Sequence, residues 1–282
     1  MRKLLLLPLI LLLGCGQGTE NVINTPPTDH AVAVTTDELK KDKAEKVYIT
    51  YVADTTDLSP EPNTPLKILL EGSFHKNEVW KDAEKKQWLA VILEQGHYYL
   101  RPAGITVRPV YDPVLDSDKV VNGKRMISGR EVISQDSNTV FLLTGLPKFK
   151  AGEVDTAAFQ KNIIYANKTL TYGFKGKEYY IKSYGDSVQQ HNNEYRYQNY
   201  GWKVSGKKKG KWLEQKLVEH ETFDDSIYML LWAGDLDRDG IPDLLIDASN
   251  HYNVSSIVLY LSSMAEKGKL YKKVAVFETV GC

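Results

Sequence analysis

Short runs of apolar, strand-forming residues alternate with polar turn signals along most of the chain, which predicts a mainly β protein. In the first half the turn signals recur about every ten residues, a spacing typical of an all-β sandwich or barrel. Tyrosine outnumbers phenylalanine by seventeen to seven, and tyrosine suits half-buried strand faces. The strands expected in this half span residues 46–52, 88–93, 98–100, 105–107 and 140–143.

The second half contains two predicted β-hairpins and one candidate helix. The hairpin turns are expected at residues 175–177 and 205–210, where lysine and glycine indicate solvated tips; a binding patch is the alternative. Residues 154–166 fit a short helix, although their apolar spacing is only fair. These elements together predict a β-rich α+β fold with an antiparallel, meander- or sandwich-like arrangement. The strands flanking the two turns are expected at 170–174, 178–181, 195–204 and 211–218.

The first residues are typical of a bacterial targeting segment. Arg2 and Lys3 precede an apolar run at 4–13, which is too short to span a bilayer and fits the h-region of a signal peptide. The run ends in Leu-Leu-Gly-Cys, which resembles the lipobox of bacterial lipoproteins. That resemblance implies cleavage after residue 14 and lipidation of Cys15; the alternative is an ordinary signal peptide that happens to carry a cysteine. By the sorting rules of that family, Gly16 favours the outer membrane over the inner one.

The remaining chain divides into a tether and two predicted domains. Residues 15–45, including the lipidated Cys15, carry little apolar pattern and cannot bury enough surface to offset the entropy of ordering them. We therefore expect a flexible tether there. Gly145, Leu146 and Pro147 interrupt the pattern, so we expect an N-terminal β domain at 46–146 and a C-terminal β domain at 147–282.

Charge and cysteine content exclude some classes of function. Thirty-six basic and thirty-six acidic residues cancel, and no basic stripe is present, so nucleic acid is a poor partner. If Cys15 carries the lipid, Cys282 is the only other cysteine and no intramolecular disulfide can form. The state of Cys282 stays open: buried, capped by a small thiol, or paired with another chain.

An acidic stretch near the C-terminus has the composition of a metal loop. Asp235, Asp237, Asp239 and Asp243 lie within nine residues, around a glycine, between two apolar strand-like runs. Carboxylates in this pattern suit a hard cation, above all calcium. An EF-hand is excluded because Ile246 stands where the twelfth loop residue should be a bidentate glutamate. The alternative is an acidic surface turn without a metal.

The stretch from Gly234 to Leu244 resembles the calcium loop of FG-GAP/VCBS repeats, which joins two strands of a propeller blade. The whole chain also resembles a group of uncharacterised bacterial lipoproteins with a similar acidic loop. The resemblance implies that calcium is bound by the side chains of Asp235, Asp237, Asp239 and Asp243 and by the backbone carbonyl of Ile241. No second copy of the loop occurs in the sequence, so we expect a single calcium hairpin in another β framework and not a full propeller.

Other polar clusters are weaker candidates. Asn250, His251 and Asn253 follow the second strand of the acidic hairpin and could form a ligand site, or a loop that hydrogen-bonds its own backbone. Glu219, His220 and Glu221 have a metal-like composition, but neighbouring strand residues face opposite sides and should not converge. The stripe Tyr195, Tyr197, Tyr200 and Trp202 could stack on sugars, although core packing is the commoner role at this spacing.

These observations predict a calcium-stabilised lipoprotein of the bacterial cell envelope with a binding or structural role. Its expected partners are the membrane, through the lipid anchor, and an envelope protein or glycan. The alternative is a calcium-dependent hydrolase acting on an envelope polysaccharide or peptide, with His251 and a carboxylate such as Asp247 near the ion. Whether the protein is an enzyme is left open by the sequence, although it favours a protein that is not.

Overall fold

The computed structural model describes residues 32–33, 48–54, 61–145, 149–189 and 195–281. The chain divides into two compact units between Thr50 and Tyr51. In the first unit, β1 (Val32–Ala33) pairs antiparallel with the beginning of β2 (Tyr48–Ala53), so two residues of the predicted tether form a short strand. The predicted signal peptide, Cys15, most of the tether and Cys282 lie outside the described residues.

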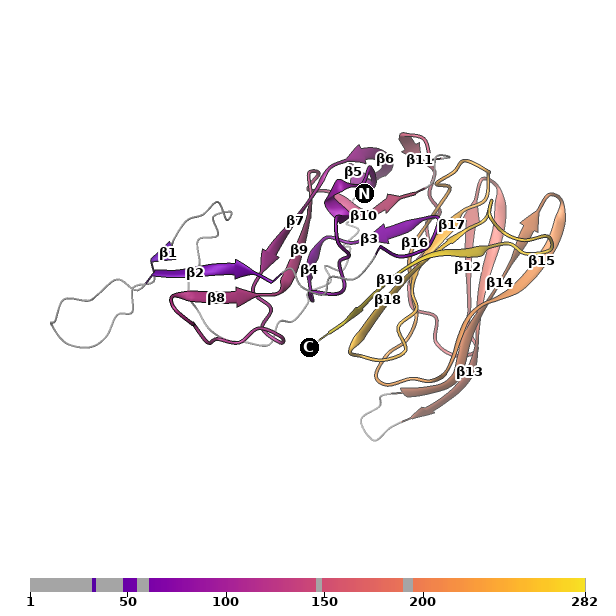
Figure 1. Cartoon of the computed structure of the whole chain (residues 1–282). Helices are drawn as coiled ribbons and strands as arrows, with labels where there is room; N and C mark the ends of the chain where they lie inside the picture. The colour runs from indigo at the N-terminus through magenta and orange to yellow at the C-terminus, as the bar shows by residue number, and fades with distance from the viewer. Residues whose placement is uncertain (1–31, 34–47, 55–60, 146–148, 190–194, 282) are drawn as a thin grey trace, which may run out of the picture. The chain divides into compact units, whose positions relative to one another are not determined.

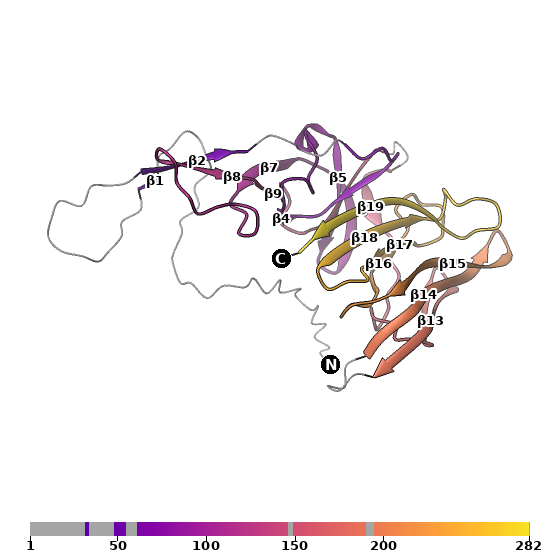
Figure 2. The same ribbon diagram turned by 60° about the horizontal axis from the view of Figure 1, so that its bottom comes forward.

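The second unit consists of antiparallel sheets, which confirms the prediction of a β-rich fold without a full propeller. Three of these sheets are stacked (Figure 1, Figure 2). The first sheet, in the order β11-β6-β5-β10-β3, contains β3 (Lys67–Leu69), β5 (Trp88–Glu94), β6 (His97–Ala103), β10 (Thr139–Thr144) and β11 (Gly152–Val154). The middle sheet contains β16 (Met229–Gly234), β17 (Asp243–Asp247), β18 (Val254–Leu261) and β19 (Lys272–Val280) in chain order. The third contains β12 (Thr169–Phe174), β13 (Lys177–Gln189), β14 (Tyr195–Lys208) and β15 (Lys211–Thr222), also in chain order.

Smaller elements complete the unit. A three-stranded sheet has the order β4-β9-β7. The only helical element in the described part of the chain is the 3-10 turn η1 (Ala83–Lys85). The bounds of the smaller strands are β4 (Gly72–Phe74), β7 (Ile105–Val110), β8 (Lys124–Ile127) and β9 (Gly129–Ser134).

The middle sheet is covered on both faces at β17. Side chains alternate along a strand, so neighbouring residues of β17 enter different cores. Leu245 packs in a core shared with the first sheet, whereas Leu244 and Ile246 pack in a core shared with the third sheet. Four of the five residues of β17 are buried as a result. A run such as Asp243-Leu-Leu-Ile, with no polar alternation, is the sequence counterpart of a strand without a solvent face.

The helix predicted at residues 154–166 is wrong. Val154 ends β11, and the following segment runs along the edge of β16 through isolated bridges from Thr156 to Gly234 and from Ile163 to Met229. Backbone hydrogen bonds to the edge strand satisfy this segment without a helix. Unpaired backbone groups at the edge of a strand favour a neighbouring segment that covers that edge. The apolar periodicity of residues 154–166 is too weak to favour a helix over this arrangement.

Both predicted hairpins are confirmed, with longer strands than expected. The β12–β13 turn lies at residues 175–176 and the β14–β15 turn at residues 209–210. The predicted domain boundary falls at residues 146–148, which lie outside the described part. Residues on both sides of that point contribute to the first core: Phe141 comes before it and Trp232 after it, and their rings are in edge-to-face contact with centroids 5.5 Å apart.

Truncation in β17 tests the double burial of the middle sheet. We expect Leu244→Ala and Leu245→Ala each to lower the free energy of unfolding by about 2–5 kcal/mol, because each leaves a cavity in a different core. Urea unfolding measures this loss. Thr171→Ala on the exposed face of β12 is the control and should change stability by less than about 0.5 kcal/mol. A near-neutral result for either leucine would contradict burial on that side.

Candidate metal site in the acidic loop

The acidic loop leaves the middle sheet at the end of β16 and re-enters it at the start of β17. Gly240 has φ +85°, a left-handed conformation that glycine adopts without strain. Its amide donates a hydrogen bond of 3.0 Å to Oδ2 of Asp235. One residue further on, the Ile241 amide donates a 2.9 Å bond to Oδ1 of Asp239. The bend at Gly240 therefore folds the loop back onto its own carboxylates.

Three aspartates converge inside this bend. Asp235, Asp237 and Asp239 each offer a carboxylate oxygen, and these atoms lie within 4.8 Å of one another. Asp235 is 1% exposed, yet its Oδ1 has no hydrogen-bond partner among the described residues, and the same holds for the buried Oδ1 of Asp237. An unsatisfied buried carboxylate oxygen carries the full cost of its desolvation. This cluster therefore has unused oxygen ligands at its centre.

Asp243 is placed differently from the other three predicted side-chain ligands. It is fully buried, and its two carboxylate oxygens accept hydrogen bonds from the amides of Leu236 (3.0 Å) and Ser262 (2.8 Å). Burial and the neighbouring Asp237 raise the pKa of Asp243 well above its usual range, despite those two amides. Through these two hydrogen bonds, the Asp243 carboxylate connects the acidic loop to the β18–β19 loop.

The β18–β19 loop supplies contacts that the sequence pattern did not reveal. The hydroxyl of Ser262 donates to Oδ2 of Asp239, and the hydroxyl of Ser263 donates to Oδ2 of Asp237. These serines are twenty or more residues away from the loop in sequence. Burial, followed by the charges of Asp239 and Asp235, raises the pKa of Asp237 in spite of the serine hydroxyl.

Two lysines from the third sheet reach the same region. The ammonium of Lys175, in the β12–β13 turn, lies 2.9 Å from Oδ2 of Asp235 and 2.7 Å from Oδ2 of Asp155. Burial alone would lower the pKa of Lys175, but the two carboxylates outweigh it and raise the pKa. Lys208 donates to the carbonyls of Ser262, Lys269 and Leu270. The prediction of simply solvated hairpin tips is therefore wrong for these two residues.

The donor set of the loop is made of oxygen only. Carboxylates without nitrogen or sulfur partners suit a hard cation such as calcium or magnesium. Lys175 neutralises part of the negative charge but contacts only Oδ2 of Asp235, so Oδ1 of that carboxylate stays available. The role predicted for the carbonyl of Ile241 stays a prediction.

The cluster of Asn250, His251 and Asn253 satisfies mainly its own backbone. Nδ1 of His251 accepts the amide of Asn253 at 3.0 Å, and the Asn250 side chain donates to the carbonyl of Thr222 at 3.1 Å. Nε2 of His251 lies 3.2 Å from Asp224, and its ring stacks on the exposed Tyr252. These contacts fit the alternative of a loop held by hydrogen bonds to backbone groups.

Asp247 does not partner His251. Oδ1 of Asp247 accepts both the amide and the hydroxyl of Ser249, and burial raises the pKa of this carboxylate. His251 pairs with another carboxylate, Asp224, and Asp247 is held by Ser249.

The remaining sequence candidates are structural. Tyr197, Tyr200 and Trp202 are buried in the second core and cannot stack on sugars, whereas Tyr195, the fourth residue of the stripe, is exposed. His220 points inward and is hydrogen-bonded to the hydroxyl of Tyr228, whereas Glu219 faces outward and accepts the hydroxyl of Tyr184. The expectation that these neighbours would not converge is confirmed.

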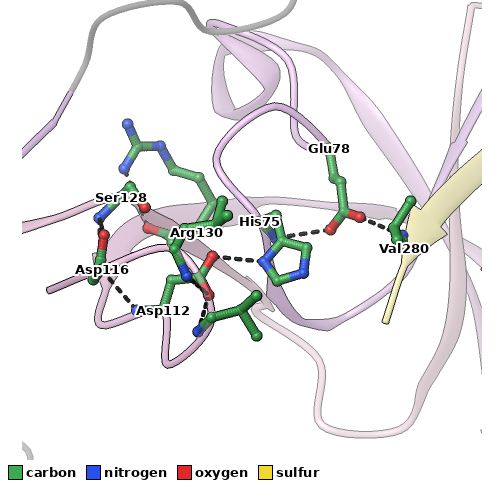
Figure 3. A network of polar contacts seen from close by, with 10 residues as sticks. His75, Glu78, Asp112, Asp116, Ser128, Arg130 and Val280 are labelled. Carbon is green, nitrogen blue, oxygen red and sulfur yellow. Dashed lines mark hydrogen bonds and ion pairs between the residues drawn. The ribbon is translucent and has the colours of Figure 1, made fainter. Parts of the chain in front are cut away.

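A further polar network was not anticipated (Figure 3). Nδ1 of His75 lies 2.6 Å from Oδ2 of the buried Asp112, whose other oxygen accepts two backbone amides. Glu78 accepts the amides of His75 and of Val280, so it connects this loop to the end of β19. No local pattern indicates this network, because His75 and Asp112 are 37 residues apart in the chain. Backbone amides dominate its contacts, which favours a role in fixing loops.

Two cavities lie away from the acidic loop. The larger, about 920 Å³, is lined by residues including Trp88, Gln135 and Phe149. The smaller, about 330 Å³, is lined by residues including Trp80 and Arg130.

Comparison with known proteins yields no matching family model, no matching curated protein and no matching solved structure. Within the described residues, no helix has the length and apolar character needed to cross a bilayer.

The buried environment of His220 predicts a pH dependence of stability. Burial, aided by Lys273 and opposed by Glu278, lowers the pKa of His220 below its usual value of 6.5. A histidine with a lowered pKa favours the folded state in its neutral form, so its contribution is complete above about pH 6.5 and is lost as the pH falls below that. We expect wild type to lose more stability than His220→Gln between pH 7.5 and 5, measured by urea unfolding. Equal losses in both proteins would contradict this role.

Proposed function

We propose that this protein is a lipid-anchored protein of the bacterial cell envelope whose β domain binds calcium in the acidic loop. Its role is binding or structural rather than catalytic. The observation that carries the metal proposal is the pair of buried, unpartnered oxygens, Oδ1 of Asp235 and Oδ1 of Asp237, inside a cluster of three carboxylates.

A divalent cation would remove the main electrostatic cost of this loop. Buried carboxylates that repel one another need a counter-charge. Lys175 supplies one positive charge, which it shares between Asp155 and Asp235. Among the described residues, Asp237 accepts hydrogen bonds only from a serine hydroxyl and from the backbone. Calcium accepts six to eight oxygen ligands in flexible geometry, which suits a loop that offers several carboxylates and a backbone carbonyl.

The ion would act as a structural staple. The acidic loop is connected to the β18–β19 loop through Ser262 and Ser263 and to the β12–β13 turn through Lys175. An ion at Asp235, Asp237 and Asp239 would therefore hold parts of the middle and third sheets together. The His251–Asp224 pair lines neither of the two cavities described above, so a binding or structural role is better supported than the hydrolase alternative.

The anchor part of the proposal rests on the sequence. The charged start, the short apolar run and Cys15 carry it, and a polar spacer follows before the folded part. A lipidated cysteine with more than one acyl chain gives stable membrane attachment.

Calcium titration of the protein starting at residue 16 tests the metal site. We expect calcium to raise the thermal unfolding midpoint by a few degrees: at tenfold excess over a dissociation constant of about 10⁻⁴–10⁻³ M it contributes about 1.4 kcal/mol. Asp237→Asn should weaken the response, because it removes one negative charge from the carboxylate cluster. Asp186→Asn, on the exposed end of β13, should keep it. An unchanged midpoint in wild type at millimolar calcium would reject the site.

Lys175→Met provides a second arm of this experiment. Removing the ammonium leaves Asp235 without its counter-charge, so the metal-free protein should be less stable and should bind calcium several-fold more tightly. Lys177→Met, two residues along the same hairpin, is the matched control because Lys177 has no ion pair with a described residue. Weaker calcium binding by Lys175→Met would contradict the proposed site. It would indicate an acidic turn whose conformation depends on the Lys175 ion pair.

Cell fractionation tests the anchor. Wild-type protein should be recovered with the membranes and be extracted by detergent, whereas Cys15→Ser should keep its signal segment uncut and lose labelling by a radioactive fatty acid. A variant protein that still carries the fatty acid would refute lipidation at Cys15.

A further inference from the structure

Three lysines form a row across the solvent-facing side of the third sheet. Lys182 on β13 is the direct neighbour of Lys203 on β14, which in turn is the direct neighbour of Lys216 on β15. All three are exposed. Because adjacent strands lie about 4.8 Å apart, the row places three positive charges along a line of about 10 Å. Like charges directly opposite one another destabilise a sheet, so the row is unfavourable without an anionic partner.

The chain itself compensates this row only in part. Lys216 pairs with Glu219 at 2.7 Å, and both Lys203 and Lys216 lie over the ring of Tyr184, 5.6 and 5.9 Å from its centroid. Lys182 forms no ion pair with any residue that the structure describes. Two of the three ammonium groups thus lack a carboxylate partner among the residues that the structure describes.

An aromatic pair, the exposed Trp212 and the half-buried Tyr180, lies on the same face beside the row. Tyr180 is two residues from Lys182 on β13, and Trp212 is four residues from Lys216 on β15, so both side chains share the lysines' face. Their ring centroids are 5.7 Å apart, and Trp212 is 54% exposed. The face therefore combines an aromatic edge with a line of positive charge.

We infer that this face binds an acidic polysaccharide. Carboxylate groups of the polymer would contact Lys182 and Lys203, and the apolar face of a sugar ring would pack against Trp212. The sheet is continuous across four strands, so an extended chain can lie along the lysine row without entering a cavity.

Charge density separates this partner from nucleic acid. The same face carries Glu178, which accepts the hydroxyl of Tyr180, and the exposed Glu214 and Glu219. Duplex DNA presents about one negative charge per 1.7 Å, and these glutamates would repel so dense a backbone. A uronic acid polymer carries its carboxylates further apart. These carboxylates can contact the lysines without lying next to the glutamates.

The inference extends the binding role proposed above but does not depend on the metal. None of its residues is a candidate ligand of the acidic loop. The test is therefore made in EDTA, which also prevents calcium from bridging the polymer and the protein.

The experiment measures binding of a size-defined oligogalacturonate to the protein by isothermal titration calorimetry. A neutral glucan oligosaccharide of the same length and single-stranded oligothymidylate are the comparison ligands. We expect saturable binding of the uronate, little binding of the glucan, and weaker binding as sodium chloride is raised. Lys203→Gln should weaken the uronate affinity about two- to fivefold, and Trp212→Ala about tenfold. Lys119→Gln and Tyr252→Ala, both exposed and outside this sheet, should bind as wild type does.

Three results would overturn the inference. The first is no saturable uronate binding at millimolar ligand. The second is equal binding by wild type, Lys203→Gln and Trp212→Ala. The third is tighter binding of the oligothymidylate than of the uronate, which would make nucleic acid the partner of this face.

Discussion

The rest of the structure depends on the burial of one sheet from both sides. β17 has no solvent face of its own, because the first sheet covers one side of the middle sheet there and the third sheet covers the other. Every residue of β17 from Asp243 to Ile246 is buried in consequence. Hydrophobic burial is the largest favourable contribution to folding, so this doubly covered layer makes the outer sheets mutually dependent.

The acidic loop emerges directly from that layer. Asp243 is both the first residue of the buried strand and the hydrogen-bond acceptor for two neighbouring loops, so the loop is fixed to the most rigid part of the unit. Lys175 reaches it from the third sheet, and Lys208 reaches the neighbouring β18–β19 loop. The charge of the loop is therefore shared between two layers, and an ion bound there would act on the contact between them.

The two faces of the third sheet have opposite chemistry. Its inner face contributes the aromatic residues of the second core, including Tyr200 and Trp202. Its outer face exposes a lysine row and the Tyr180–Trp212 pair. Alternation along the strands separates these sets, so a sheet can serve the core on one side and a ligand on the other.

The sequence by itself determined the β-rich class, both hairpins and the strands that flank the acidic loop. These follow from local alternation and from glycine and lysine at turns, which need no knowledge of distant residues. It also predicted the convergence of Asp235, Asp237 and Asp239, because a bend at Gly240 acts within five residues. Only the tertiary structure decided that residues 155–163 cover a strand edge instead of forming a helix, and that Tyr197 is core. It alone placed Lys175, Ser262 and Ser263 beside the loop and aligned three lysines across three strands. These outcomes depend on sheet stacking and register between segments far apart in the chain, and local periodicity carries no information about either.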